Sequence, residues 1–217
     1  MPDYAAQRLN MIKTQLAAND VADPRIQAAM GAVARERFIP PAGRALAYSD
    51  APVPLAPGRA LLDPRSFAKL LELANIAPTD HILDVGCATG YSAAVLAQLA
   101  RSVVALDQDA EFLRLAGDLV PACGGHNVVV ALGPLAEGVK VKAPYDAILV
   151  EGGIEEPPQK LLSQLGEGGR LVAVLQTGTQ GRAHVFVREN GRIGVRTDFD
   201  AVVPPLVGFQ RSVGFVF

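Results

Sequence analysis

The residues best suited to bind a ligand stand in the middle of the chain, at the end of a short apolar run. The run at residues 81–85 predicts a buried strand, and Asp84 lies near its end. Gly86 and Gly90 flank the turn that follows, and a predicted helix begins directly after it. Glycine in such a turn permits a positive φ and a close approach of the backbone to a ligand, while the helix N-terminus favours a carboxylate or a phosphate. We therefore predict a ligand-binding turn at the carboxyl end of this strand.

A second acidic residue follows the next predicted strand, at residues 102–106. Asp107 and Gln108 come directly after this run, and an acidic side chain about 20 residues beyond the glycine turn is suited to hold ribose hydroxyls. A dinucleotide-binding turn would carry a third glycine. The carboxylate of Asp84 would repel a pyrophosphate but accept a hydrogen bond from an ammonium group. The ligand described by this pattern has an amine, a carboxylate and a ribose, and we predict S-adenosylmethionine as the cofactor.

The predicted cofactor site draws on the loops after four strands. Gly133 follows the third predicted strand at 127–131, and Glu151 follows the fourth at 146–150, where it is placed to face the pocket. A tight turn that binds no ligand and a turn that binds a nicotinamide cofactor are the alternatives. The residues predicted to bind the cofactor are Asp84, Gly86, Cys87, Ala88, Gly90, Asp107, Gln108, Gly133 and Glu151.

Composition argues against several other classes of function. The 217 residues are 50% apolar and 19% charged, with a formal net charge of −2, which suits a folded α/β domain and not a disordered chain. The charges are interspersed, so nothing predicts contact with nucleic acid or with a membrane surface. The apolar runs are too short for a spanning helix and the first residues lack a signal-peptide core. We therefore expect a cytoplasmic protein.

The cysteines and histidines predict no further chemistry. Cys87 and Cys123 are too few for a disulfide framework, and we interpret Cys87 as a small apolar residue of the turn and not as a nucleophile. The three histidines show no ligand spacing, so we expect no metal site.

The elements that must position these residues alternate regularly. Between residues 78 and 176, predicted strands at 81–85, 102–106, 127–131, 146–150 and 169–175 alternate with predicted helices at 91–99, 110–119 and 159–165. Such alternation predicts right-handed crossovers and an α/β fold with a doubly wound, mostly parallel sheet. The glycine-rich residues 166–169 are expected to form the turn before the fifth strand.

The two ends of the chain add an N-terminal and a C-terminal extension. Residues 1–77 predict helices at 4–18, after Asp23-Pro24 and after Asp63-Pro64, with extended, non-helical Pro-rich stretches at 38–42 and 51–58. Predicted strands at 183–188 and 192–199 flank the hairpin signal Asn190-Gly191, and residues 212–217 are expected to pair with the sheet. We expect residues 1–77 to pack on an α/β domain of residues 78–217, forming one structural domain overall.

Several longer stretches give the chain a resemblance to a known family. Two of the N-terminal stretches, at 35–40 and 47–50, are more specific than the glycine turn, which would fit many methyltransferases. The stretches are Met11-Ile-Lys-Thr-Gln-Leu16, Asp20-Val-Ala-Asp-Pro-Arg-Ile26, Arg35-Glu-Arg-Phe-Ile-Pro40, Ala47-Tyr-Ser-Asp-Ala-Pro-Val-Pro-Leu55, Asp84-Val-Gly-Cys-Ala-Thr-Gly-Tyr-Ser-Ala93, Pro144-Tyr-Asp-Ala-Ile-Leu-Val-Glu-Gly152 and Gln164-Leu-Gly-Glu-Gly-Gly-Arg-Leu-Val172. With them, nearly the whole chain resembles the protein-L-isoaspartate O-methyltransferases.

This resemblance implies a Rossmann-like, S-adenosylmethionine-dependent methyltransferase with a repair activity. Members of the family methylate the free α-carboxylate of an isoaspartyl residue in an aged protein, and the ester then cyclises to a succinimide without enzymatic help. A charged carboxylate needs no base to attack a sulfonium methyl group, so alignment and exclusion of water suffice. We therefore assign no catalytic residue. Isoaspartyl proteins or peptides are the implied substrates, and we expect a monomer or a small homo-oligomer.

The chain departs from the family at the segment Gly58-Arg-Ala-Leu-Leu-Asp-Pro64, where the family reads Gly-Gln-Thr-Ile-Ser-Gln-Pro. The resemblance places two hydroxyls of that stretch at the substrate carboxylate, and here they become Ala60 and Leu62. Loss of one such donor can cost about 10²–10³ in rate. Arg59, Leu62 and Asp63 are thus the predicted substrate-binding residues. Arg59 could pair with the substrate carboxylate, although a solvated Arg59 and a helix cap at Asp63 are the simpler interpretations.

A second departure follows the third predicted strand. The family carries Gly-Asp-Gly there, and the resemblance assigns its acidic residue to the adenine, whereas this chain has Gly133 followed by Pro134. These departures leave two alternatives open. The protein could methylate a different carboxylate, or it could be a catalytically impaired binding or scaffold protein with the same fold.

Overall fold

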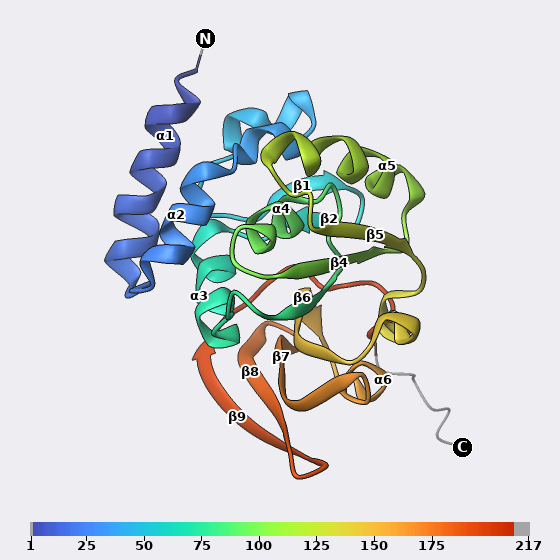
Figure 1. Cartoon of the computed structure of the whole chain (residues 1–217). Helices are drawn as coiled ribbons and strands as arrows, with labels where there is room; N and C mark the ends of the chain where they lie inside the picture. Colours follow the sequence, from blue (N-terminus) through green and yellow to red (C-terminus); the bar gives the residue numbers. More distant parts are fainter. Residues whose placement is uncertain (1, 211–217) are drawn as a thin grey trace, which may run out of the picture.

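A seven-stranded sheet forms the centre of the described part of the chain, residues 2–210 of a computed structural model (Figure 1). The strands lie in the order β5–β4–β3–β6–β7–β8–β9. The first five strands in this order are parallel to one another, β8 pairs antiparallel with β7, and β9 pairs antiparallel with β8. The predicted doubly wound, mostly parallel sheet is confirmed. The strands are β3 (His81–Val85), β4 (Ser102–Asp107), β5 (Val128–Leu132), β6 (Tyr145–Ile154), β7 (Leu165–Thr177), β8 (Gln180–Glu189) and β9 (Arg192–Asp200).

The order of the strands creates a switch point between β3 and β6. From β3 the chain moves outward through β4 and β5, and it then crosses back to add β6 on the other side of β3. In such sheets, ligands bind where the order reverses, at the carboxyl ends of the strands. Asp84 near the end of β3 and Glu151 in β6 therefore flank this point.

Helices cover both faces of the sheet. In β3, Ile82 packs into the apolar cluster on one face and Leu83 into the cluster on the other face, as expected for a strand that is buried on both sides. The helices of the first face are α3 (Pro64–Ala74), α4 (Tyr91–Ala97) and α5 (Ala110–Leu119), and the second face carries α6 (Gln159–Leu162). Helix α6 ends before the predicted residue 165 because Leu165 already pairs with Tyr145 as the first residue of β7.

The glycine-rich residues 166–169, predicted as a turn, lie inside β7. The pairing with β6 jumps from Tyr145–Leu165 to Ala147–Arg170, so three extra residues bulge out of the ladder. Gly168 takes a φ of +76°, and a side chain at Gly169 would lie 2.8 Å from the carbonyl of Tyr145. Glycine permits this bulge without ending the strand, which is why the turn prediction was wrong.

The N-terminal extension folds largely as predicted. Helix α1 (Tyr4–Met11) continues through a π-helical turn at Ile12–Leu16 and a 3-10 turn at Ala17–Asn19, and α2 (Pro24–Ala32) begins after its cap at Asp23. The Pro-rich stretch at 51–58 is extended, as expected, and β1 (Val53–Ala56) and β2 (Arg59–Leu61) pair there as a small antiparallel sheet separate from the main one. At 38–42 the extended prediction was wrong, because 3-10 helices at Arg35–Phe38 and Pro41–Leu46 take in most of the stretch, and a proline is tolerated at the first position of a helix. A two-stranded sheet has only edge strands, so Pro54 is tolerated in it.

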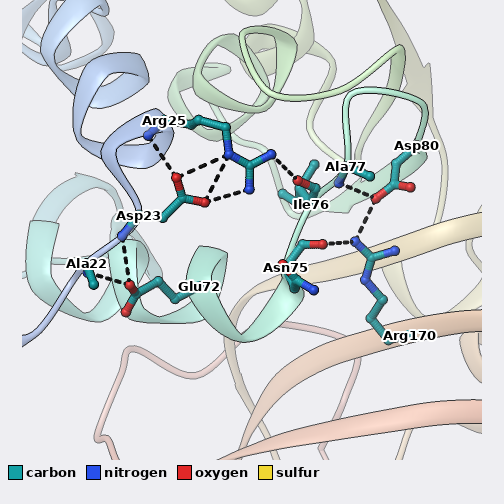
Figure 2. A network of polar contacts seen from close by, with 9 residues as sticks. All are labelled: Ala22, Asp23, Arg25, Glu72, Asn75, Ile76, Ala77, Asp80 and Arg170. Carbon is teal, nitrogen blue, oxygen red and sulfur yellow. Dashed lines mark hydrogen bonds and ion pairs between the residues drawn. The ribbon is translucent and has the colours of Figure 1, made fainter.

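Polar contacts fasten the N-terminal helices to the core (Figure 2). Glu72 of α3 accepts hydrogen bonds from the backbone N–H groups of Ala22 and Asp23 at 2.5 and 3.2 Å. Arg25 pairs with Asp23 at 2.6 Å and donates to the carbonyl of Ile76 at 3.0 Å. The start of α2 is therefore joined to the last turn of α3 and to the residues that follow it.

The same network continues into the sheet through Arg170 of β7 (Figure 2). Its guanidinium donates to the carboxylate of Asp80 at 2.6 Å and to the carbonyl of Asn75 at 2.7 Å, and it also contacts the carbonyl of Ala74. Only 15% of the Arg170 side chain and 9% of the Asp80 side chain are exposed. Arg170 thus ties the C-terminal end of α3 to the central sheet. The division of the chain at residue 77 stays a prediction.

The C-terminal hairpin was predicted correctly. Asn190 and Gly191 both take positive φ, at 51° and 72°, which is the conformation that a type I′ turn requires between antiparallel strands. The strand predicted at residues 212–217 lies outside the described residues. Within residues 2–210, no helix is both long and apolar enough to cross a bilayer.

Replacing Arg170 with Met should lower the free energy of unfolding by about 2–3 kcal/mol, because Asp80 and the carbonyl groups of Ala74, Asn75 and Asp146 would lose a largely buried cationic partner. Chemical denaturation of the purified protein measures this loss. Arg114→Met is the matched control: Arg114 forms its ion pairs at the surface, with 60% of its side chain exposed, and such pairs contribute about 0–1 kcal/mol. Equal losses in the two variants would contradict the role given to Arg170.

Candidate functional site

Three acidic residues gather at the carboxyl ends of neighbouring strands β3, β4 and β6. Asp84 of β3 and Asp107 of β4 are fully buried, and the side-chain Oε1 of Glu151 in β6 is buried as well. The parallel pairing of β4, β3 and β6 brings these ends to the same edge of the sheet. Three carboxyl groups taken out of water must each be paired, be protonated or bind a ligand.

Asp84 has one satisfied and one free oxygen. Its Oδ2 accepts a hydrogen bond of 2.7 Å from the Ser92 hydroxyl of α4, while its Oδ1 has no hydrogen-bond partner among the described residues. Burial raises the pKa of Asp84 from 3.8 to about 7, the hydrogen bond from Ser92 opposes this rise, and the charge of Asp107 adds to it. Near neutral pH the group is therefore poised between its neutral and its ionised form.

Glu151 also has a buried carboxyl oxygen. Its Oε1 is buried without a hydrogen-bond partner among residues 2–210. Burial raises the pKa of Glu151 well above its usual value, and the neighbouring charge of Asp84 raises it further, whereas Arg35 lowers it. Two buried carboxyl groups that repel each other do not readily ionise together. The pair of Asp84 and Glu151 therefore offers free acceptor oxygens whose ionisation a cationic ligand would favour.

Asp107, in contrast, has every acceptor position filled. Its Oδ1 accepts from Arg59 Nη1 at 2.9 Å and from the backbone N–H of Asp109 at 3.1 Å. Its Oδ2 accepts from Arg59 Nη2 at 2.6 Å and from the backbone N–H of Ala88 at 2.8 Å. A carboxylate offers about four lone-pair positions, so all of them are engaged.

Arg59 lies over this part of the site and not in solvent. Its side chain is 9% exposed, it donates to the carbonyl of Gly86 at 3.2 Å, and its guanidinium lies 5.2 Å from the ring centre of Phe112. The interpretation of Arg59 as a solvated residue is therefore wrong. Sequence spacing gave no sign of the pair because 48 positions separate Arg59 from Asp107.

The glycine turn has the predicted backbone, but protein side chains approach its glycines where a ligand was expected to do so. Gly86 and Gly90 take φ values of +85° and +93°. A side chain at Gly86 would meet Leu206 at 3.0 Å, and one at Gly90 would meet Val120 at 2.7 Å. The close neighbours that require glycine here thus belong to the protein itself. Helix α5 and the residue after it approach Gly90, and the C-terminal segment approaches Gly86.

That C-terminal segment closes one side of the site. Gly153 of β6 donates to the carbonyl of Pro204 at 2.9 Å and accepts from the N–H of Leu206 at 2.8 Å. Leu206 is 3% exposed, and a side chain at Gly152 would lie 2.9 Å from its Cβ. Leu206 therefore packs between the ends of β3 and β6, a position that no local sequence pattern indicated.

The remaining residues predicted for the cofactor take varied positions. Cys87 is 1% exposed, and burial raises the pKa of its thiol well above the usual value, in keeping with its interpretation as a small apolar residue. Ala88 has a φ of +47° and turns its N–H toward Asp107. Gly133 donates its N–H to the backbone carbonyl of Asp107 at 3.0 Å, and Gln108 is exposed at the end of β4.

Two residues predicted to bind the substrate have structural contacts. Leu62 is 3% exposed in the core, and its carbonyl accepts a 2.5 Å hydrogen bond from Arg35. Asp63 accepts from the N–H of Ser66 at 2.9 Å, so it caps α3 as expected.

Sequence reasoning missed Arg35, which is 1% exposed, contacts the ring of Tyr91 and donates to the carbonyl of Ala47 at 2.7 Å. Its place in one of the more specific stretches of the sequence was the available signal.

The fold and this acidic edge define a Rossmann-like α/β protein of the methyltransferase type, with its site at the switch point of the sheet. A family model described as Protein-L-isoaspartate(D-aspartate) O-methyltransferase matches residues 6–210. The chain therefore belongs to the protein-L-isoaspartate O-methyltransferase family.

Individual proteins of this family show the same relationship. A protein-L-isoaspartate O-methyltransferase of Koribacter versatilis is 36% identical over 207 residues, which cover 95% of this chain and 93% of that protein. Protein-L-isoaspartate O-methyltransferase 1 of Rhodopseudomonas palustris is 40% identical over 169 residues, covering 78% and 69%. A family structure from Plasmodium falciparum, in complex with S-adenosyl-L-homocysteine, matches with a TM-score of 0.79 at 19% identity over 93% of this chain and 98% of that one. At this identity the likeness shows the shared fold.

The raised pKa of Asp84 predicts a pH-dependent stability. Between 3.8 and about 7 the folded chain holds a proton on Asp84 that the unfolded chain has lost. The free energy of unfolding should therefore fall as the pH rises through this window and level off above it. Asp84→Asn should flatten the fall, whereas Asp118→Asn, which changes an exposed carboxylate on α5, should keep it. Urea denaturation across the window measures both, and an unchanged slope in Asp84→Asn would show that Asp84 is ionised throughout.

Proposed function

We propose that this protein transfers a methyl group from S-adenosylmethionine to the α-carboxylate of isoaspartyl residues in damaged proteins. The observation that carries the proposal is a pair of buried acceptor oxygens, on Asp84 and Glu151 at the switch point, that have no hydrogen-bond partner in the described part of the chain. The relatives, which cover most of this chain at 36–40% identity, are named for this reaction. Isoaspartyl proteins or peptides are thus the proposed partners, and a cytoplasmic location and a monomer or small homo-oligomer stay predictions.

The acidic residues fit the proposed cofactor in different ways. The oxygens of Asp84 and Glu151 without partners can accept hydrogen bonds from the ammonium group of S-adenosylmethionine, and its positive charge would favour their ionised forms. Asp107 can hold the ribose hydroxyls only after Arg59 has left it, because its acceptor positions are filled. The backbone of Cys87, Ala88 and Gly133 lies beside these groups.

The residues present also suit the proposed chemistry. When bound, the cofactor supplies a sulfonium methyl group that an ionised carboxylate accepts without a general base. The protein's own task is then to hold the two reactants in line and to exclude water. Leu206, packed beside the glycine turn, and the buried surroundings of Asp84 serve the second part of this task.

The part of the site that is predicted to bind the methyl acceptor differs from that of the family. Ala60 and Leu62 carry no hydroxyl, and the core position of Leu62 and the capping bond of Asp63 favour structural roles for these two residues. Arg59 is the remaining cation of the predicted set. The contacts of Arg59, Leu62 and Asp63 with the substrate stay predictions.

Incubation with methyl-labelled S-adenosylmethionine and an isoaspartyl peptide tests the proposal. We expect a base-labile methyl ester on this peptide and none on the same peptide with a normal aspartyl residue. Asp84→Asn should weaken cofactor binding about 10- to 100-fold, since a buried charged acceptor is lost, whereas Asp118→Asn at the surface should leave binding and transfer unchanged.

The outcomes separate the alternatives. Cofactor binding with methylation of other lysate components, but none of the isoaspartyl peptide, would indicate a different acceptor. Undetectable cofactor binding at saturating concentration would indicate a binding or scaffold protein and would overturn the proposal. Unchanged affinity in Asp84→Asn would overturn the placement of the ammonium group.

A further inference from the structure

We propose that Arg59 is a latch: it occupies Asp107, the carboxylate suited to the cofactor's ribose, and must be displaced before S-adenosylmethionine can bind there. The inference rests on the proposed function, because it presumes that this cofactor uses the site. It adds a gating step that the chain performs with its own side chain. Four features of the structure support it: the saturation of Asp107, the burial of the pair, the anchoring of the guanidinium and the position of Arg59 in a separate hairpin.

The saturation of Asp107 makes the competition direct. Two of its four acceptor positions are filled by the backbone N–H groups of Ala88 and Asp109, which belong to the rigid turn and to the start of α5. The other two are filled by Nη1 and Nη2 of Arg59 at 2.9 and 2.6 Å. A pair of ribose hydroxyls would need these last two positions. The hydroxyls and the guanidinium therefore exclude each other.

The burial of the pair makes the closed state stable. The side chains of Arg59 and Asp107 are 9% and 0% exposed, so water screens their interaction little. The two-pronged geometry is the strong form of an arginine–carboxylate pair. The guanidinium is held further by the carbonyl of Gly86 and by the face of Phe112. These contacts come from the glycine turn and from α5, the same elements that surround the cofactor site.

The position of Arg59 makes opening feasible. It lies on β2, which within residues 2–210 pairs with β1 in the small two-stranded sheet and not with the main sheet. The hairpin turn contains Gly58, which has a φ of +72° and open space around it. The guanidinium can therefore swing away, or the hairpin tip can shift, without breaking the ladder that carries Asp84 and Asp107.

The latch has a measurable consequence for affinity. A ligand that binds only the open state has its apparent dissociation constant multiplied by the inverse of the open fraction. If the closed state holds about 90–99% of the molecules, removing the latch should tighten binding about 10- to 100-fold. An ordinary cofactor-contacting arginine would behave in the opposite way, because its removal would weaken binding.

Calorimetric titration with S-adenosylhomocysteine, which carries the same ribose and amine, tests the latch. Arg59→Gln keeps a polar side chain of similar length but loses the charge and the fork, and we expect it to bind at least about 10-fold more tightly than the unmodified protein. Arg59→Lys, which keeps the charge but loses the fork, should lie between the two. Arg65→Gln is the matched control, since Arg65 is an exposed residue in the first turn of α3, and its affinity should not change.

Thermal unfolding supplies a second measurement that does not depend on turnover. Without ligand, Arg59→Gln should unfold at a lower temperature than the unmodified protein, because Asp107 loses its partner. With saturating S-adenosylhomocysteine, the rise in its unfolding temperature should be larger. A variant that has lost its fold would show no transition, and Arg59→Lys would then carry the comparison.

The results distinguish failure of the latch from failure of the proposed function. The latch alone would be overturned if the unmodified protein binds S-adenosylhomocysteine and both Arg59→Gln and Arg59→Lys bind it equally or more weakly. Tighter binding by Arg59→Gln, together with no transfer to isoaspartyl peptides by the unmodified protein, would support the latch and count against the proposed methyl acceptor. Undetectable binding by all variants at saturating ligand would overturn both.

Discussion

Burial of acidic side chains at the carboxyl edge of the sheet is the constraint on which the site depends. A carboxylate out of water must find partners or a proton, and the three groups here meet this demand differently. Asp107 is paired with Arg59 and two backbone N–H groups. Asp84 accepts one hydrogen bond from Ser92, and Glu151 has a buried oxygen with no partner among residues 2–210. The result is a site with one anionic part already neutralised by the protein and one part ready for a cation.

The surrounding architecture serves this edge. The main sheet brings the strand ends together, while the small sheet of β1 and β2 delivers Arg59 from outside it. Leu206 comes from the other end of the chain and packs on the glycine turn. At the opposite edge of the sheet, before the first residue of β3, the network around Arg170 and Asp80 holds the N-terminal helices against the same core (Figure 2). Arg59, the strand ends and Leu206 thus bring residues from the beginning, middle and end of the chain together at the carboxyl edge.

Family membership and local departures have different consequences here. The match over residues 6–210 shows a shared fold and descent, and the acidic positions of β3 and β4 agree with a nucleoside cofactor. The departures at 58–64 act on single contacts. Leu62 is part of the core, Asp63 caps α3, and Arg59 pairs with Asp107 at the carboxyl edge of the sheet. Compared with the family, the segment at 58–64 therefore lacks two hydroxyl groups and carries Arg59, whose guanidinium pairs with Asp107.

The sequence by itself determined the order of strands and helices, the helix caps at Asp23 and Asp63 and the hairpin at Asn190-Gly191, because apolar periodicity, capping and turn chemistry act between residues close in the chain. It also indicated Asp84 and Asp107, since strand ends in a parallel sheet meet by topology. The bulge in β7, the packing of Leu206 and the buried contacts of Arg35 were decided by tertiary structure. So was the pairing of Arg59 with Asp107 across 48 positions. Such contacts depend on which distant segments fold against each other, and the pattern of residues close in the chain does not predict this.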